Sequence, residues 1–435
     1  MQNHSSTQNN ATRRSFLKTT GVAAAGLSWM STSSAKAAKA ETLALNGGKK
    51  AVTKGSDASR WPLYRKEEEE AVLKLVRNPS YSPLVELENT WRKQFKTNYC
   101  KAHCNGSSAI TSMYFALDLP PGSEIMVPSY TFFSTISTMR LLDLVPVFVD
   151  INPQTLNFDL EDAKKRLTKN TKAVIPVHWI GLPNEMDHIC DWAKEKGLFV
   201  LEDSCHAHGA KLKGRYMGTW GRMGAFSFQA SKPLPAIEGG MGTYQEKDDY
   251  DRATAFGHYG KCAGKYAKYK GSGLSTKFRI HPFAAALVNS QLPILEARNA
   301  AGAKQVRSLN DRLLQLPGLL EQTYNRPDMV RLHYSWNMLF IDEKKAGISR
   351  AAAVKALQAE GVSTSNLSYT LQHKLPLYSE AKWWHHAPVI PELPGSEKAN
   401  QWALPLPYFT SQRPELCDQY VKAFEKVWAH RDKLS

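Results

Sequence analysis

Short apolar runs alternate along the chain with stretches whose apolar residues recur at helical spacing. Leu198–Leu201 and Ala225–Phe228 leave no room for a helix, so both are predicted to be buried strands. Pro146–Asp150 and Lys172–His178 are further strand-like runs with a helical pattern between them. Repeated β-α units of this kind predict an α/β fold. No G-x-G-x-x-G motif accompanies these runs, which argues against a dinucleotide ligand.

The pattern changes toward the C-terminus. Phe283 to about Leu314 is rich in Ala and Leu and predicts a long helical region. The strand-like stretch Met329–Ile341 and helical patterns at Ala351–Glu360 and Glu415–Lys433 follow it. This order predicts a smaller α+β domain, joined to the first domain by the long helical region.

The first forty residues have the pattern of a targeting segment. Thr12–Lys18 carries paired arginines followed by Phe-Leu-Lys, the uncharged stretch Thr19–Met30 comes next, and Ala35-Lys36-Ala37 ends the segment. This order is typical of a secretory signal, and the paired arginines favour the twin-arginine export machinery. The uncharged stretch is too short to span a bilayer, so we expect no stable membrane anchor. A cytoplasmic tail with a chance Arg-Arg pair is the alternative.

We therefore expect three parts and an exported, for example periplasmic, protein. Residues 1–37 are predicted to be the signal peptide, residues 38–296 an N-terminal arm with the large domain, and residues 297–435 the small domain.

The charge balance is basic, with a net charge of +16. A surplus of this size suits nucleic acid, an anionic surface or anionic substrates. We expect no nucleic-acid partner, because no nucleic-acid motif is present and the basic residues are dispersed. The exception is a Lys- and Tyr-rich loop over residues 261–270, which is either a solvated loop or an anion-attracting rim over the active site.

The six cysteines show no regular framework. Cys100 and Cys104, with His103 between them, could form a short disulfide or hold a metal. Because no second pair of ligands follows, we expect unpaired core residues and no metal site.

The first candidate chemistry lies after the two predicted strands. Glu202 and Asp203 follow one strand, and Lys232 lies in a loop after the other. Ligands bind at strand ends in α/β sheets. A lysine amine can form a Schiff base with pyridoxal 5'-phosphate (PLP), and an aspartate can keep the ring nitrogen of PLP protonated. On spacing alone, a solvated lysine and a structural carboxylate are equally good interpretations.

A second candidate lies at the start of a predicted helix. Gly106, Ser107 and Ser108 precede a helical pattern, where free backbone N–H groups can bind a phosphate. A plain helix N-cap is the alternative.

Two segments resemble a known family. FSFQASK…EGGMGTY, within Ala225–Tyr244, is similar to the FSF-x-x-x-K-x-x-x-x-GEGG signature of the DegT/DnrJ/EryC1/StrS aminotransferases, the PLP enzymes of amino-sugar and aminocyclitol synthesis. LEDSCHAHGA, Leu201–Ala210, resembles their ED-x-A-(Q/H)-A-H-G-A segment. The resemblance implies PLP fold type I, with a mostly parallel mixed sheet between helices in the large domain and a smaller C-terminal α+β domain.

The resemblance also implies roles for individual residues. Lys232 would attach PLP and Asp203 would face its ring nitrogen, while Phe132 would stack on the ring. Ser107 would be the main phosphate contact and Ser108 the second.

Further roles follow from the same resemblance. His206 falls beside the ring hydroxyl, Ser227 supplies another phosphate hydroxyl, and His178 is expected to be structural. Lys277 stands where relatives carry an Asn that reaches the phosphate in the partner subunit, although a surface lysine is an equal alternative. Ile237 replaces a usual Gly, which predicts a bulkier loop.

The resemblance implies a homodimer with shared active sites. We expect it to transfer an amino group from glutamate or glutamine to a keto-sugar or keto-cyclitol, in amino-sugar, aminocyclitol or polysaccharide metabolism. A PLP-dependent sugar dehydratase is one alternative, but those relatives carry His in place of Lys232. An exported non-catalytic or sensory protein that has kept the PLP fold is the other.

Overall fold

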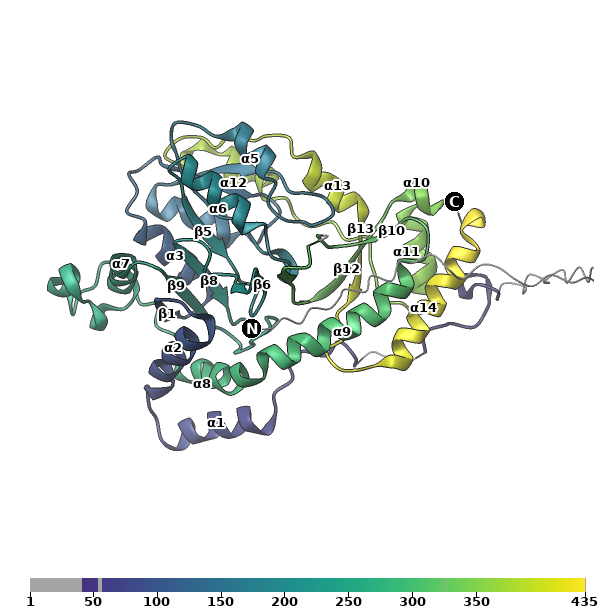
Figure 1. Cartoon of the computed structure of the whole chain (residues 1–435), viewed down its shortest axis with the longest axis horizontal. Coiled ribbons are helices and arrows are strands. Elements are labelled where there is room, and N and C mark those ends of the chain that lie inside the picture. Colours follow the sequence, from purple (N-terminus) through teal and green to yellow (C-terminus); the bar gives the residue numbers. More distant parts are fainter. Residues whose placement is uncertain (1–40, 54–56, 325, 435) are drawn as a thin grey trace, which may run out of the picture. The chain divides into compact units, whose positions relative to one another are not determined.

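A seven-stranded mixed sheet forms the larger part of the fold (Figure 1). Two of the predicted site residues, Asp203 and Ser227, are the last residues of two of its strands. The computed structural model describes residues 41–53, 57–324 and 326–434, and the expected signal peptide lies outside them. The strand order is β1-β9-β8-β5-β4-β2-β3. Strands β8, β5, β4, β2 and β3 are parallel, whereas β9 is antiparallel to both of its neighbours. The bounds are β1 Tyr99–His103, β2 Glu124–Pro128, β3 Val145–Val149, β4 Thr171–Val174, β5 Phe199–Asp203, β8 Met223–Ser227 and β9 Gly240–Tyr244.

Helices cover both faces of this sheet, so its strands are apolar on both sides. Leu201 of β5 packs in a core with helices α3 and α7, whereas Val200 faces a core with α5 and α6. Helices α2 and α8 cover the second face beside β1, β8 and β9. The bounds are α1 Lys66–Arg77, α2 Ser82–Phe95, α3 Gly106–Ala116, α4 Ser134–Ser137, α5 Leu160–Arg166, α6 Met186–Glu195, α7 Lys247–Gly257 and α8 Pro282–Gln291.

The alternation along the strands places the polar side chains at their ends. Because successive residues face opposite sides of a strand, Asp203 shares the α3 side with Leu201, and Glu202 faces the other side. Ser227 of β8 lies on the α3 side too, two residues beyond Ala225. Sheet geometry therefore brings Asp203 and Ser227 to the same end of the same face.

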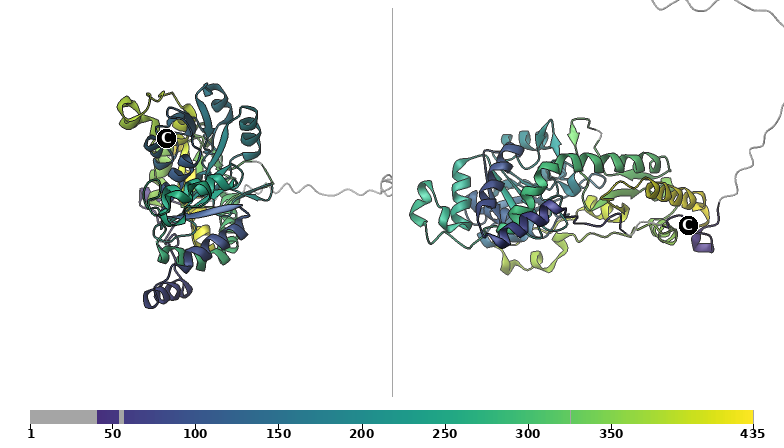
Figure 2. Two further views of the ribbon diagram at one scale, coloured as in Figure 1. Left: turned by 90° about the vertical axis from the view of Figure 1, so that its left-hand side faces the viewer. Right: turned by 90° about the horizontal axis from the view of Figure 1, so that it is seen from below.

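A smaller sheet, with the order β10-β12-β13, packs against α9, α11 and α14 (Figures 1 and 2). In Figure 2, the long helix α9 extends from the large sheet toward the small sheet. The bounds are β10 Leu319–Glu321, β12 Trp336–Ile341, β13 Ala403–Pro407, α9 Leu295–Leu313, α10 Glu343–Ala346, α11 Arg350–Ala359, α12 Pro376–Ser379, α13 Pro394–Trp402 and α14 Pro414–Ala429. A third sheet joins β6 Lys211–Leu212, β7 Arg215–Tyr216 and β11 Met329–Val330 in the order β11-β6-β7.

Two predicted elements differ from the structure. The single helical region from Phe283 is interrupted by a 3-10 turn at Leu292–Ile294, where Pro293 cannot donate a helical hydrogen bond. The strand predicted over Met329–Ile341 is two strands, β11 and β12, with a loop between them that reaches the site.

The domain boundary predicted at residue 296 falls inside α9. Residues 40–435 group into one compact unit, so the division into a large and a small domain stays a prediction. Within the described ranges, no helix is both long enough and apolar enough to cross a bilayer.

A buried carboxylate orders the turns beside the end of β5. Glu202 has no exposed surface and accepts hydrogen bonds from the backbone N–H groups of Gly218 and Gly221, both at 2.7 Å. Its Oε2 lies 3.0 Å from Nε2 of His178, whose Nδ1 accepts a hydrogen bond from the backbone of Asn184. The strand-end histidine is thus structural, as expected from the sequence.

Replacing this carboxylate tests its contribution to stability. We expect Glu202→Gln to lower the free energy of unfolding by about 2 kcal/mol, because the amide presents N–H donors where a backbone N–H needs an acceptor. Urea unfolding at equilibrium measures the change. Glu161→Gln on the surface of α5, where the side chain is 74% exposed, is the control and should change stability by under about 0.5 kcal/mol. Equal effects of the two variants would contradict the assignment.

Candidate active site

A cavity of about 490 Å³ lies at the carboxyl ends of β5 and β8. Polar side chains converge there from several strand ends and from the start of α3, as in other α/β folds. Seven of the residues singled out from the sequence line this cavity: Gly106, Ser107, Phe132, Asp203, His206, Ser227 and Lys232. The other two, Ser108 and Lys277, do not line it.

Lys232 lies in a turn that is held through its backbone carbonyls. The indole N–H of Trp61 donates to the carbonyl of Lys232 at 3.1 Å, and Arg298 donates to the carbonyl of Pro233. The side chain of Gln291 donates to the carbonyl of Pro235 at 2.7 Å. The Lys232 Nζ lies 4.8 Å from the ring centre of Tyr334, close enough for a cation–π contact. The amine is therefore presented to the cavity by a braced turn rather than by a mobile loop.

Asp203 is fixed by two donors. The hydroxyl of Thr135 donates to its Oδ2 at 2.7 Å, and the backbone N–H of Cys205 donates to its Oδ1 at 3.1 Å. Asp203 is only 4% exposed, so its charge lies in a site of low polarity where its effect on a ligand is large. This geometry fixes which way the carboxylate faces.

The start of α3 combines a cap with open N–H groups. The side chain of Asn105 accepts a hydrogen bond from the N–H of Ser108 at 2.8 Å, and the Ser108 hydroxyl donates back to the Asn105 carbonyl. Gly106 and Ser107 are the first two residues of α3, so no preceding helical turn supplies carbonyl acceptors for their N–H groups. These N–H groups are therefore available to an anion. Ser108 thus caps the helix and is not among the residues that line the cavity, and its expected phosphate contact stays a prediction.

Gly106 is required by close packing. A Cβ at this position would lie 2.9 Å from the Cβ of Ser227 and 3.1 Å from the Sγ of Cys205. The glycine lets the helix start approach β8, which places the Ser227 hydroxyl beside the free N–H groups. These groups together form an anion-binding end of the cavity.

Aromatic rings form the remaining walls. Phe132 lines the cavity and is 53% exposed, so its face is open to a ligand. The ring of His206 lies between Trp179 and Tyr334, at centre distances of 5.1 and 4.6 Å. Burial, together with the charge of Lys232, holds the pKa of His206 well below its usual value, so the imidazole is neutral at physiological pH.

Lys277 lies in a neighbouring cavity, with Glu238 in the wall of both cavities. The exposed side chains Val76, Tyr81 and Phe283 line this second cavity. Lys277 is thus not part of the cavity of its own subunit. Its expected reach to the phosphate of a partner subunit stays a prediction.

Ile237, which precedes Glu238, has a left-handed backbone conformation with φ of 65° and is 58% exposed. This conformation is unfavourable for a β-branched residue and natural for the Gly that relatives usually carry. The loop has therefore kept the backbone shape while presenting a large apolar side chain to the surface.

Several residues of the site were not found from the sequence. Thr135 orients Asp203 from α4, and Tyr334 and Tyr369 reach the cavity from the C-terminal third of the chain. The sequence around Thr135 indicates its role only through its position, because its hydroxyl follows Phe132 by about one helical turn. No local pattern marks the two tyrosines, because tertiary folding alone brings them to the cavity.

The cavity fits PLP. It offers an amine, a fixed carboxylate, an anion-binding helix start and an open aromatic face, which are the groups that a phosphorylated pyridine aldehyde needs. When bound, PLP supplies an electron sink for a carbanion on the substrate.

The cysteines form no disulfide in the structure. All six are free thiols. The Cys100 thiol is buried and donates to the carbonyl of Glu88, and the Cys104 sulfur lies 3.3 Å from the Ser108 hydroxyl.

Comparison with known proteins agrees with the geometry. The spore coat polysaccharide biosynthesis protein SpsC of Bacillus subtilis is 28% identical over 380 residues, covering 84% of this chain and 95% of SpsC. GDP-perosamine synthase of Escherichia coli O157:H7 is 29% identical over 310 residues, covering 71% of this chain and 82% of the synthase. The X-ray structure of an aminotransferase from Psychrobacter cryohalolentis shares the fold, with a TM-score of 0.78 at 24% identity, covering 86% of this chain and 99% of that one.

A sequence model of the DegT/DnrJ/EryC1/StrS aminotransferase family matches residues 63–425, which is most of the chain. The protein therefore belongs to this family of PLP-dependent aminotransferases.

Proposed function

We propose that the protein transfers the amino group of glutamate or glutamine to a keto-sugar or keto-cyclitol, as an exported homodimer. The observation that carries the proposal is the convergence of Lys232 and Asp203 on one cavity with an anion-binding helix start. The name of GDP-perosamine synthase and the polysaccharide role in the name of SpsC support a sugar acceptor. Lys232 itself argues against a sugar dehydratase, because those relatives carry His at this position.

The residues of the cavity have separate tasks in this reaction. Lys232 would hold the cofactor, and its amine would move a proton to or from the reacting carbon of the substrate. Asp203 would face the ring nitrogen, and Thr135 keeps that carboxylate in place. Ser107 and Ser227 bind the phosphate, and neutral His206 is an uncharged hydrogen-bonding partner for the ring hydroxyl.

The first test follows the cofactor absorption of the purified holoprotein. Adding glutamate or glutamine should shift the spectrum, because transfer of the donor's amino group would change the absorbing form of the cofactor. Lys232→Ala should lose the covalent attachment, which mass spectrometry after borohydride reduction detects. Lys268→Ala, in an exposed loop, is the control and should keep both properties. A coloured protein that responds to no amino donor would favour the non-catalytic, sensory alternative.

A homodimer with shared sites would bury the apolar surface around Lys277. Val76 and Tyr81 are each 58% exposed beside this lysine, and patches of this kind are typical of interfaces. In such a dimer, Lys277 of one subunit would serve the phosphate in the other, as a point charge in place of an amide.

Complementation between two inactive variants tests the shared site. Lys232→Ala and Lys277→Ala subunits, co-expressed with different tags, should form a mixed dimer with one complete site. We expect this mixed dimer to be several times more active than either homodimer. Activity equal to the average of the two homodimers would show that Lys277 does not act across the interface.

Export through the twin-arginine route suits this protein, because that route carries folded proteins and the cofactor is loaded in the cytoplasm. Arg13 and Arg14 lie outside the described residues, and the proposal rests on their sequence pattern. Arg13→Lys combined with Arg14→Lys keeps the charge and should hold the protein in the cytoplasm, as cell fractionation would show. Lys18→Arg is the control. Unchanged fractionation of the double variant would rule this route out.

A further inference from the structure

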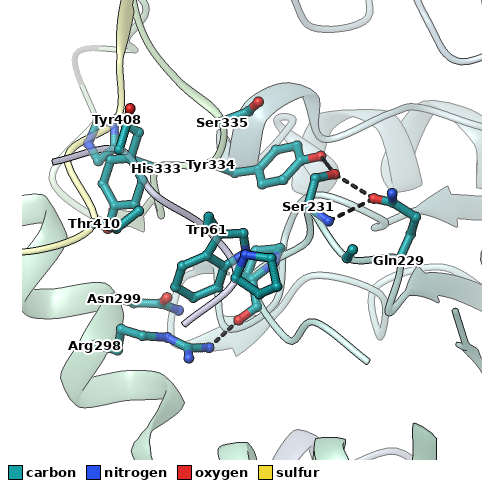
Figure 3. Close-up of a pocket in the computed structure, with 14 residues that line it drawn as sticks. Trp61, Gln229, Ser231, Arg298, Asn299, His333, Tyr334, Ser335, Tyr408 and Thr410 are labelled. Carbon is teal, nitrogen blue, oxygen red and sulfur yellow. Dashed lines mark hydrogen bonds between the residues drawn. The ribbon is translucent and has the colours of Figure 1, made fainter. Parts of the chain in front are cut away.

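A second cavity, of about 300 Å³, lies behind the Lys232 turn (Figure 3). The N-terminal arm, α9, the loop before β12 and the segment after β13 surround it. Tyr334, Ser231 and Gln229 line both cavities. The Ser231 hydroxyl is 2.8 Å from the Tyr334 hydroxyl and donates to the Gln229 side chain, so a hydrogen-bonded wall separates the two cavities. Nothing in the proposed transamination uses this space.

Arg298 of α9 gives the second cavity a positive charge. Its guanidinium donates to the carbonyl of Pro233 and lies 5.0 Å from the ring centre of Trp61. It also donates a long hydrogen bond, of 3.5 Å, to the side-chain oxygen of Gln291, and the carboxylate of Glu68 acts on it only through its charge. Burial lowers the pKa of Arg298 to about 10, because the loss of water around the charge outweighs the opposing effects of Tyr408 and Glu68. The cation is therefore poorly compensated and keeps donors free for a ligand.

Two neutral groups line the cavity together with this cation. The Nδ1 of His333 is buried and has no hydrogen-bond partner in the described part of the chain. A Cβ at Gly302, one turn after Arg298, would lie 1.8 Å from the hydroxyl of Tyr408, so the glycine makes room for that hydroxyl. Burial raises the pKa of Tyr408, which keeps the hydroxyl protonated and able to donate. The polar groups of the cavity thus suit an acceptor with one negative charge.

We propose that this cavity binds the carboxylate of a small organic acid, with Arg298 as its charge partner and Tyr408 as a neutral donor. The planar guanidinium matches a carboxylate, and such pairs are strong where water is excluded. A single cation balances one carboxylate but leaves a dianionic phosphate uncompensated. The volume is at the lower end of the range for small-ligand sites, which also favours a small acid.

The position of the site links it to the reacting lysine. The same guanidinium that would bind the acid holds the carbonyl of Pro233, next to Lys232. The bound acid is one of two molecules. It is either the amino donor, extending past Ser231 and Tyr334 into the first cavity, or a separate acid that changes the position of the Lys232 turn through Arg298. The binding site stands on its own geometry and does not depend on the proposed transamination.

Calorimetric titration of the holoprotein with butyrate tests the site, because butyrate has one carboxylate and no amino group, and the bound cofactor occupies the other cavity. Arg298→Gln should weaken binding by at least about tenfold, the usual loss when a charge-assisted hydrogen bond is removed. Tyr408→Phe, which keeps the ring packing, should weaken it by roughly threefold. Butyramide, the neutral analogue, should not bind.

Arg312→Gln is the matched control, since Arg312 lies on the same helix but pairs with Asp418 on the surface. It should bind butyrate as the unchanged protein does. Competition by glutamate would identify the acid as the donor, and binding without competition would identify a separate acid. Absence of binding to the unchanged protein, or equal binding by all three variants, would overturn the proposal.

Discussion

The placement of one carboxylate at the end of a buried strand is the constraint on which the site depends. Asp203 ends β5 on the face covered by α3, where Thr135 and the backbone of Cys205 hold both of its oxygens. The other polar groups of the cavity lie around this carboxylate. The amine of Lys232 comes from the turn after the neighbouring strand, and the anion-binding start of α3 closes another side.

Several hydrogen bonds hold the loops next to the cavity in place. Glu202, on the opposite face of β5, secures the loop between β7 and β8 through two buried hydrogen bonds, and three side chains donate to the carbonyls of the Lys232 turn. Such bracing restricts motion in the groups that would bind a cofactor and move a proton. Ile237 has no such stabilising role, because its large side chain is exposed and its backbone conformation is unfavourable for a β-branched residue.

The sequence predicted the parts of the site that depend on local pattern. Continuous apolar runs identified β5 and β8, and the motif residues after them line the cavity. The missed features depend on contacts between distant segments. The whole stretch around Tyr334 has a strand-like pattern, but a loop interrupts it at this residue. The Ala- and Leu-rich helical pattern likewise continues past Pro293, although the helix is interrupted there. For Ser108, capping and phosphate binding have the same sequence signal, and only the geometry separates them.

A crystal structure of the holoprotein tests the central claim most directly. The account predicts continuous density from the Lys232 Nζ to the cofactor, with an Asp203 oxygen about 3 Å from the ring nitrogen. Attachment at another lysine, or a ring nitrogen that faces away from Asp203, would contradict it.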